Sequence, residues 1–142
     1  MGKINSTRVF LGGLLAGVVI VALGFVTYAI YLEKLWTPVM EALGLSTQMT
    51  TRIFIFAVLL SLISGLLAVW LYAAIRPRYG AGPKTALIAG IAFYVLTGLL
   101  PAISFSLMGM FPTRVLVIDG LTGLVIYVVA TLAGAWVYKE QP

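Results

Sequence analysis

Residues 9–32 read VFLGGLLAGVVIVALGFVTYAIYL, an apolar run without a charged side chain. A helix needs roughly 20 apolar residues to cross a hydrocarbon core of about 30 Å. Three further apolar runs of sufficient length follow, at 53–75, 85–110 and 115–138. Each is predicted to be a helix, because lipid offers no partner for the unpaired backbone groups of an open strand. The sequence therefore predicts an all-α, polytopic membrane protein, an antiparallel bundle of four transmembrane helices that forms one membrane domain over residues 1–142.

The composition of the whole chain agrees with a lipid environment. Of its 142 residues, 62% are hydrophobic and 9% are charged, whereas soluble domains have about 45–50% apolar and about 25% charged residues. The chain contains neither cysteine nor histidine. This excludes disulfides, thiolate chemistry and histidine-ligated metals or haem. We therefore expect no cofactor and no metal site.

Two of the three connections between the predicted helices are short. The sequence RPRYGAGPK at 76–84 combines basic residues with prolines and glycines that end one helix and begin the next. Residues 111–113, Phe-Pro-Thr, form a turn tight enough to make the third and fourth helices a hairpin. Both connections therefore favour helices that lie side by side.

The first connection, residues 33–51, is the longest. In it, Thr37 is predicted to cap a short helix that has Pro38 at its first position. Gly44 is predicted to close the turn that follows. We expect this short helix to lie on the membrane surface in the first outer loop, and an ordinary loop is the alternative.

Lysine and arginine are distributed unequally between the two predicted sides of the membrane. The side with the chain termini and the turn at 76–84 carries Lys3, Arg8, Arg76, Arg78, Lys84 and Lys139, and the other side carries Lys34, Arg52 and Arg114. The positive-inside rule therefore predicts that both termini are cytoplasmic. The net charge of +5 mostly reflects this bias, and no clustered basic face indicates a nucleic-acid partner. Membrane lipids are the partners that we expect.

Small residues spaced by four occur on all four predicted helices. Such residues let two helices approach closely within a membrane. The glycines predicted to lie at these packing interfaces are Gly13, Gly17, Gly65, Gly90 and Gly134. Packing inside the bundle is the first interpretation. A subunit interface in a homo-oligomer, formed most readily by the first helix, is the alternative.

The third predicted helix contains Pro101 near its middle. Proline has no backbone N–H and clashes with the carbonyl four residues earlier, here that of Thr97. We therefore expect a kink at Pro101, with the Thr97 or Ser104 side chain helping to satisfy the freed groups. A kink is either architectural or, as in some transporters, part of a substrate pathway.

Asp119 is the one acidic residue inside a predicted helix, and a carboxylate at that depth is energetically costly. Helical spacing places it on one face with Thr122 and several small residues, so this face is expected to point into the bundle. Three interpretations remain open. Asp119 is hydrogen-bonded and structural, or it pairs with Arg114 or Arg52, or it couples protons or cations to transport. The candidate intramembrane polar site consists of Asp119, Thr122, Arg114 and Thr97.

The predicted helices lack the residues that catalysis needs. No two acidic residues lie within a turn or two of each other inside a span, so neither an acid/base pair nor a carboxylate metal site is indicated. Every lysine lies in a loop or tail, which removes a serine–lysine dyad. The aromatic residues near the span ends, among them Tyr28, Tyr31 and Trp36, are interpreted as membrane-interface anchors. The protein is therefore not expected to be an enzyme.

Three stretches carry a resemblance to known proteins: LGGLLAG at 11–17, AVWLYAAIRPRYG at 68–80 and ATLAGAWVY at 130–138. Together they resemble those of small bacterial inner-membrane proteins with four helices. The resemblance covers the whole chain and implies a bacterial inner-membrane location, but it implies no activity.

Three functional hypotheses follow from the sequence. The first is an accessory or structural subunit that packs in a homo-oligomer or a larger membrane complex. The second is a small oligomeric transporter or channel whose pathway includes Asp119, Thr122 and the kink at Pro101. The third is a subunit that binds a pigment, a quinone or a lipid through shape, with contributions from Tyr94 or Tyr127.

Overall fold

The computed structural model describes residues 4–140, and all regular structure in that range is helical. Lys3, counted above on the terminal side, lies outside the described residues. The elements are α1 (Ser6–Thr27), the π-helical segment η1 (Tyr28–Leu32), α2 (Glu33–Ala42), α3 (Thr51–Tyr79), α4 (Pro83–Tyr94), the π-helical segment η2 (Val95–Leu99), α5 (Leu100–Leu107) and α6 (Thr113–Val137). They join into four runs long and apolar enough to cross a membrane. The predicted all-helical chain with four such helices is confirmed.

The separate short helix predicted in the first outer loop is wrong. α2 continues from α1 through η1 as one run of 37 residues, Ser6–Ala42, and Pro38 lies inside α2. Thr37 is not a cap, because its hydroxyl donates to the Glu33 carbonyl at 2.8 Å. The Glu33 N–H bonds to the Tyr28 carbonyl, so helical hydrogen bonding continues from η1 into α2 and no new N-terminus forms at Thr37.

The end of this long helix agrees with the sequence. Gly44 has a φ of +69°, the left-handed conformation that glycine adopts without steric cost. The N–H of Leu45 donates to the Met40 carbonyl at 2.9 Å, which closes the helix. A 37-residue helix is about 55 Å long, well over the thickness of a hydrocarbon core of about 30 Å. The α2 end is therefore expected to project beyond the lipid tails.

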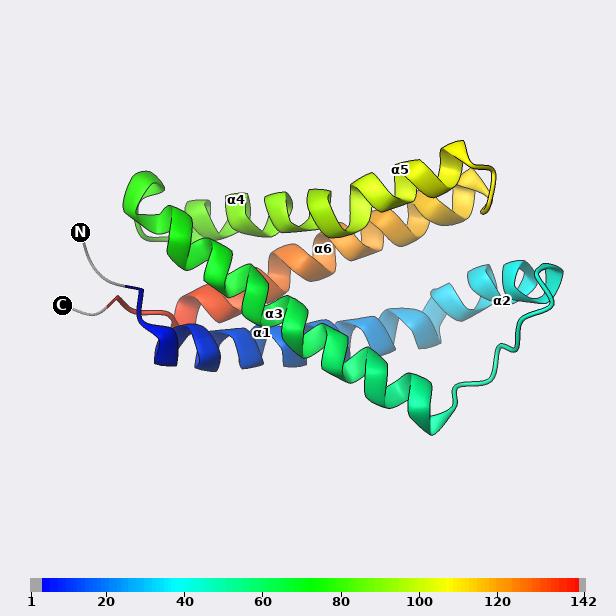
Figure 1. The fold of residues 1–142 in the computed structure, drawn as a ribbon, viewed down its shortest axis with the longest axis horizontal. Helices are drawn as coiled ribbons and strands as arrows, with labels where there is room; N and C mark the ends of the chain where they lie inside the picture. The colour runs from blue at the N-terminus through cyan, green and yellow to red at the C-terminus, as the bar shows by residue number, and fades with distance from the viewer. Residues whose placement is uncertain (1–3, 141–142) are drawn as a thin grey trace.

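The helices are arranged around α1 and α6 (Figure 1). α1 packs against α3 and α6, and α4 packs along α6. α3 crosses α1 and diverges from it toward Thr51, where residues 43–50 connect α2 to α3. The turn between α3 and α4 lies at the same end of the molecule as Asn5 and Tyr138, and α2 and the turn between α5 and α6 lie at the other end.

Glycines allow these helices to touch backbone to backbone. A Cβ atom on Gly65 of α3 would overlap the backbone nitrogen of Gly17 on α1. A Cβ on Gly134 of α6 would lie 2.6 Å from the carbonyl oxygen of Gly12 on α1. Each of the glycines predicted at packing interfaces faces another helix of this same chain, namely Gly13, Gly17, Gly65, Gly90 and Gly134.

A cluster of side chains ties the helices together at the end that holds Asn5 and Tyr138. The Asn5 N–H donates to the Tyr138 hydroxyl at 3.4 Å, and the Gly82 N–H donates to the Tyr72 hydroxyl at 3.3 Å. The rings of Tyr72 and Tyr138 meet edge to face with centroids 5.9 Å apart. The Arg76 guanidinium lies 5.4 Å from the centre of the Tyr138 ring. The two chain ends and the turn between α3 and α4 are therefore joined directly.

The helix that contains Pro101 changes its hydrogen bonding just before the proline. The π-helical segment η2 separates α4 from α5, and Figure 1 shows the axis changing direction there. Prolines and π turns are both established causes of helix bending. The hydroxyls of Thr97 and Ser104 each donate to the carbonyl four residues earlier, at 2.9 and 3.1 Å. Neither hydroxyl therefore bonds the Thr97 carbonyl, and the prediction that one of them does so is wrong.

Candidate binding cleft

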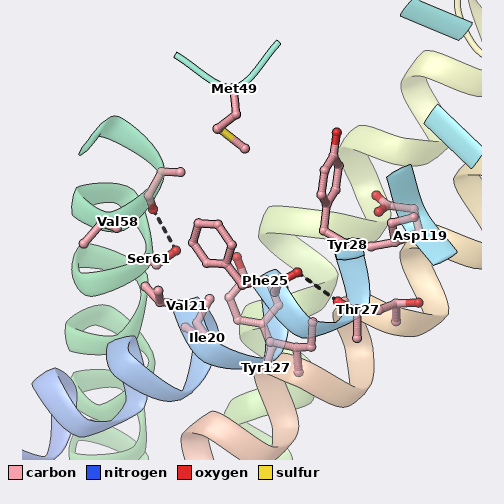
Figure 2. A pocket seen from close by; sticks show the side chains of 16 residues that line it. Ile20, Val21, Phe25, Thr27, Tyr28, Met49, Val58, Ser61, Asp119 and Tyr127 are labelled. Atoms are coloured by element: carbon pink, nitrogen blue, oxygen red, sulfur yellow. Dashed lines mark hydrogen bonds between the residues drawn. The ribbon is translucent and has the colours of Figure 1, made fainter. Parts of the chain in front are cut away.

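A cleft opens between α1, α3 and α6 on the side where α3 diverges. It consists of two adjoining cavities, each of about 320 Å³. Both are lined by Tyr28, Leu32, Met49 and Asp119. Figure 2 shows Met49 reaching from the loop before α3 toward the space above Phe25. We refer to the two cavities together as the cleft.

Both cavities of the cleft are lined mostly by apolar groups, and the cavity nearer α2 is also bordered by polar residues of the loop before α3. Side chains of Ile20, Val21, Phe25 and Val58 line one part. The part nearer α2 is lined by Asp119 with Tyr28, Trp36 and the polar residues of the loop, Ser46, Thr47 and Gln48. Ligand sites are mostly apolar with a few placed polar groups and measure about 300–1,000 Å³. The cleft therefore has the size and lining of a small-molecule site.

The Asp119 carboxylate has one hydrogen-bond donor from a distant part of the sequence. The indole nitrogen Nε1 of Trp36 donates to Oδ1 at 3.4 Å. Among residues 4–140, no lysine or arginine nitrogen lies within 4.0 Å of this carboxylate. Arg114 is exposed, and the Arg52 guanidinium lies over the Phe56 ring, 5.8 Å from its centre. The structure therefore brings neither arginine to Asp119.

Thr122, one turn after Asp119, joins α6 to η1. Its hydroxyl donates to the Ile118 carbonyl at 2.8 Å. A threonine hydroxyl has only one hydrogen, so the Tyr31 hydroxyl, 2.5 Å from the Thr122 oxygen, is the donor of that second bond. This pair fixes η1 against α6 next to the carboxylate.

Two further tyrosines lie where α4 packs against α6. Tyr127 lines the cleft, and its ring lies 5.5 Å from that of Phe93, centre to centre. Tyr94 is buried, and its ring packs where Cβ atoms on Gly120 and Gly123 would lie. Of the two tyrosines considered for ligand binding, Tyr127 borders the cleft and Tyr94 supports α6 outside its lining.

The predicted polar site is brought together in part. Asp119 and Thr122 both line the cleft, whereas Thr97 and Arg114 are exposed and lie outside its lining. The sequence analysis missed Tyr28, Trp36 and Met49 as cleft residues. Tyr28 and Trp36 are eight residues apart in the sequence, that is, two intervals of four residues. This spacing puts them on one face of a continuous helix. The shared face was not inferred from this spacing because Thr37 and Pro38 were interpreted as the start of a new helix.

The π-helical segment η1 supplies two of the residues shared by both cavities. Single π turns inside α-helices occur frequently at functional sites. Within residues 4–140, no group of three or more acidic side chains could hold a metal ion. The arrangement is therefore suited to binding an organic molecule through one carboxylate, aromatic rings and an apolar wall.

Comparison of the chain with protein-family models, with curated proteins and with solved structures finds no match in any of the three. The fold and the cleft nevertheless define a class, a helical protein with four candidate membrane spans and a partly apolar cleft between three of them.

Proposed function

We propose that this chain is an antiparallel four-span protein of the bacterial inner membrane whose cleft binds a lipid-like, amphiphilic molecule. The observation that carries the proposal is the cleft itself, with an apolar part between α1, α3 and α6 and a single carboxylate toward α2. An amphiphile could enter from the surrounding lipid because α3 diverges from α1 on that side.

The proposed orientation places both termini in the cytoplasm. Arg8, Arg76, Arg78, Lys84 and Lys139 lie near the end that holds Asn5 and Tyr138, and this excess of basic residues supports a cytoplasmic position. The polar part of the cleft lies toward α2, at the opposite end. The bound headgroup would then sit near the outer surface of the membrane, with its apolar part directed toward the bilayer centre.

Filling the cleft is expected to remove the bound molecule. Gly24 lines the apolar part, and a Cβ built on it meets no atom within 4 Å, so Gly24→Leu is expected to place its side chain in the cleft. Ala22→Leu is the matched control, because Ala22 is exposed on the same helix and outside the lining. We expect the wild type and Ala22→Leu to retain one molecule per chain and Gly24→Leu to retain less than a tenth of that amount.

The measurement is mass spectrometry of small molecules that co-purify in native-lipid nanodiscs, compared with the bulk membrane extract. Equal enrichment in Gly24→Leu and the wild type would contradict the proposed cleft, as would a wild type that enriches no molecule.

A second candidate function is that of an accessory or structural subunit in a homo-oligomer or a larger membrane complex. The observation that favours it is the exposed N-terminal half of α3, with the large apolar side chains Ile53, Phe54, Phe56, Leu59 and Leu60. The same nanodisc preparation tests this candidate, because a stable complex would carry a second membrane protein, or a second copy, in constant ratio. A particle that contains one copy and no other protein would contradict it.

A further inference from the structure

We propose that the molecule bound in the cleft is a lipophilic organic cation whose ammonium group lies beside Asp119. This inference rests on the proposed function, because it names the chemical class of the amphiphile. Three features of the cleft carry it: a carboxyl group without a cationic partner, aromatic side chains that line the same cavity, and three hydroxyl groups that share a cavity with this carboxyl group and already donate their hydrogens.

The first feature is the carboxyl group of Asp119 and its lack of a cationic side-chain partner. A carboxylate within a membrane-spanning helix is costly unless a partner compensates it. In the part of the chain that the structure describes, its only side-chain donor is the Trp36 indole at 3.4 Å, and no cationic side chain lies within 4.0 Å. Because Asp119 lines both cavities, a cationic group in the cleft reaches this carboxylate directly.

The second feature is the aromatic lining around Asp119. Tyr28 and Trp36 border the same cavity as the carboxylate, and Figure 2 shows the Tyr28 ring beside Asp119. Aromatic faces attract organic cations, and they do so more strongly where water is displaced. A quaternary or protonated ammonium group therefore finds both a carboxyl group and aromatic side chains at this position.

The third feature is the direction of the hydrogen bonds. In the lining, the hydroxyl of Thr122 donates to the Ile118 carbonyl, that of Thr27 to the Leu23 carbonyl and that of Ser61 to the Ala57 carbonyl. Their hydrogens are thus engaged within the protein. An anionic headgroup needs free donors or cations, whereas an ammonium group needs acceptors and ring faces. In the cavity that they line together with Asp119, these three hydroxyls therefore offer acceptor oxygens to a cation.

The test uses the full chain in nanodiscs of an uncharged galactolipid and three probes with similar chains: dodecyltrimethylammonium, tetradecanol and dodecyl sulfate. Saturable binding above that of empty nanodiscs is measured by equilibrium dialysis. We expect the cationic probe to bind wild-type protein at least about tenfold more tightly than tetradecanol, and dodecyl sulfate to show no saturable binding. Equal or weaker binding of the cation would overturn the inference.

Asp119→Asn keeps the shape of the side chain and removes its charge. We expect it to weaken binding of the cationic probe about tenfold or more and to leave that of tetradecanol unchanged. Glu41→Gln removes an exposed carboxylate outside the cleft lining and should change neither. Unchanged binding of the cation to Asp119→Asn would overturn the inference. If this variant does not fold, Tyr28→Leu provides the second test, with an expected loss of about threefold for the cation alone.

The two proposals fail in different ways. Saturable tetradecanol binding that Gly24→Leu abolishes, without preference for the cation, would overturn the cationic ligand and leave the cleft supported. The absence of saturable binding for all three probes would overturn the cleft as well.

Discussion

Replacing Gly65 with leucine is expected to prevent the fold from forming. A single Cβ at this position already overlaps the Gly17 nitrogen and lies close to the Gly13 carbonyl oxygen. Both are backbone atoms of α1, so no side chain can rotate away to make room. Overpacking a close-packed site costs about 1–3 kcal/mol or more, and a leucine that separates two backbones should lie at or above the upper end of that range.

The measurement is the free energy of unfolding in mixed micelles, from a titration with a denaturing detergent. Gly24→Ala is the matched control on α1, because its added Cβ meets no atom within 4 Å, and helix propensity alone predicts a gain of up to about 1 kcal/mol. If Gly65→Leu unfolded at the same detergent fraction as the wild type, the described crossing of α1 and α3 would be incorrect.

Tyr138→Ala is expected to have the second-largest effect, a loss of about 3 kcal/mol in the free energy of unfolding. The side chain is 4% exposed and packs edge to face on Tyr72. Its removal leaves a cavity where the last helix meets α1 and α3, and it takes the ring from the Arg76 guanidinium. The same detergent titration measures the loss.

Tyr138→Phe separates the ring from its hydroxyl. It removes only the bond from the Asn5 N–H, which is long at 3.4 Å, so its expected cost is below about 1 kcal/mol. Equal losses for the two variants would show that the hydroxyl, and not the ring, stabilises this end. A stable Tyr138→Ala would contradict the described packing.

The four helical runs could be predicted because length and apolar composition decide them. Residues 9–32 and 53–75 lie within the helices at Ser6–Ala42 and Thr51–Tyr79, and no tertiary contact is needed to infer them. The extension of the first helix could not be inferred in the same way. Thr37 and Pro38 match the local sequence pattern of a helix start. Only the hydrogen bond between the Glu33 N–H and the Tyr28 carbonyl of η1 shows that the first helix continues into α2.

In the candidate site, too, positions on one regular helix could be predicted, whereas positions that depend on contacts between distant segments could not. Helical spacing predicted Asp119 and Thr122 on one face of a helix, and the structure places both on α6, where they line the cleft. Met49 lies in a loop, so its position in the cleft depends on where α3 diverges from α1, which no spacing rule gives. Thr97 was named for its nearness to Pro101 in sequence, but its side chain bonds within its own helix.

In the proposed topology, the chain crosses a membrane four times and the cleft lies toward the outer face. Because the chain has no native cysteine, single cysteines report position without ambiguity. Suitable exposed sites are Ser46 before α3, Ala81 between α3 and α4, Met108 between α5 and α6, and Lys139 after α6. The measurement is labelling of each single-cysteine variant in spheroplasts with a membrane-impermeant maleimide.

We expect Ser46→Cys and Met108→Cys to react in intact spheroplasts, and Ala81→Cys and Lys139→Cys to react only after permeabilisation. The reverse pattern would contradict the orientation. Labelling of Ser46→Cys and Ala81→Cys from the same side would contradict the four crossings themselves.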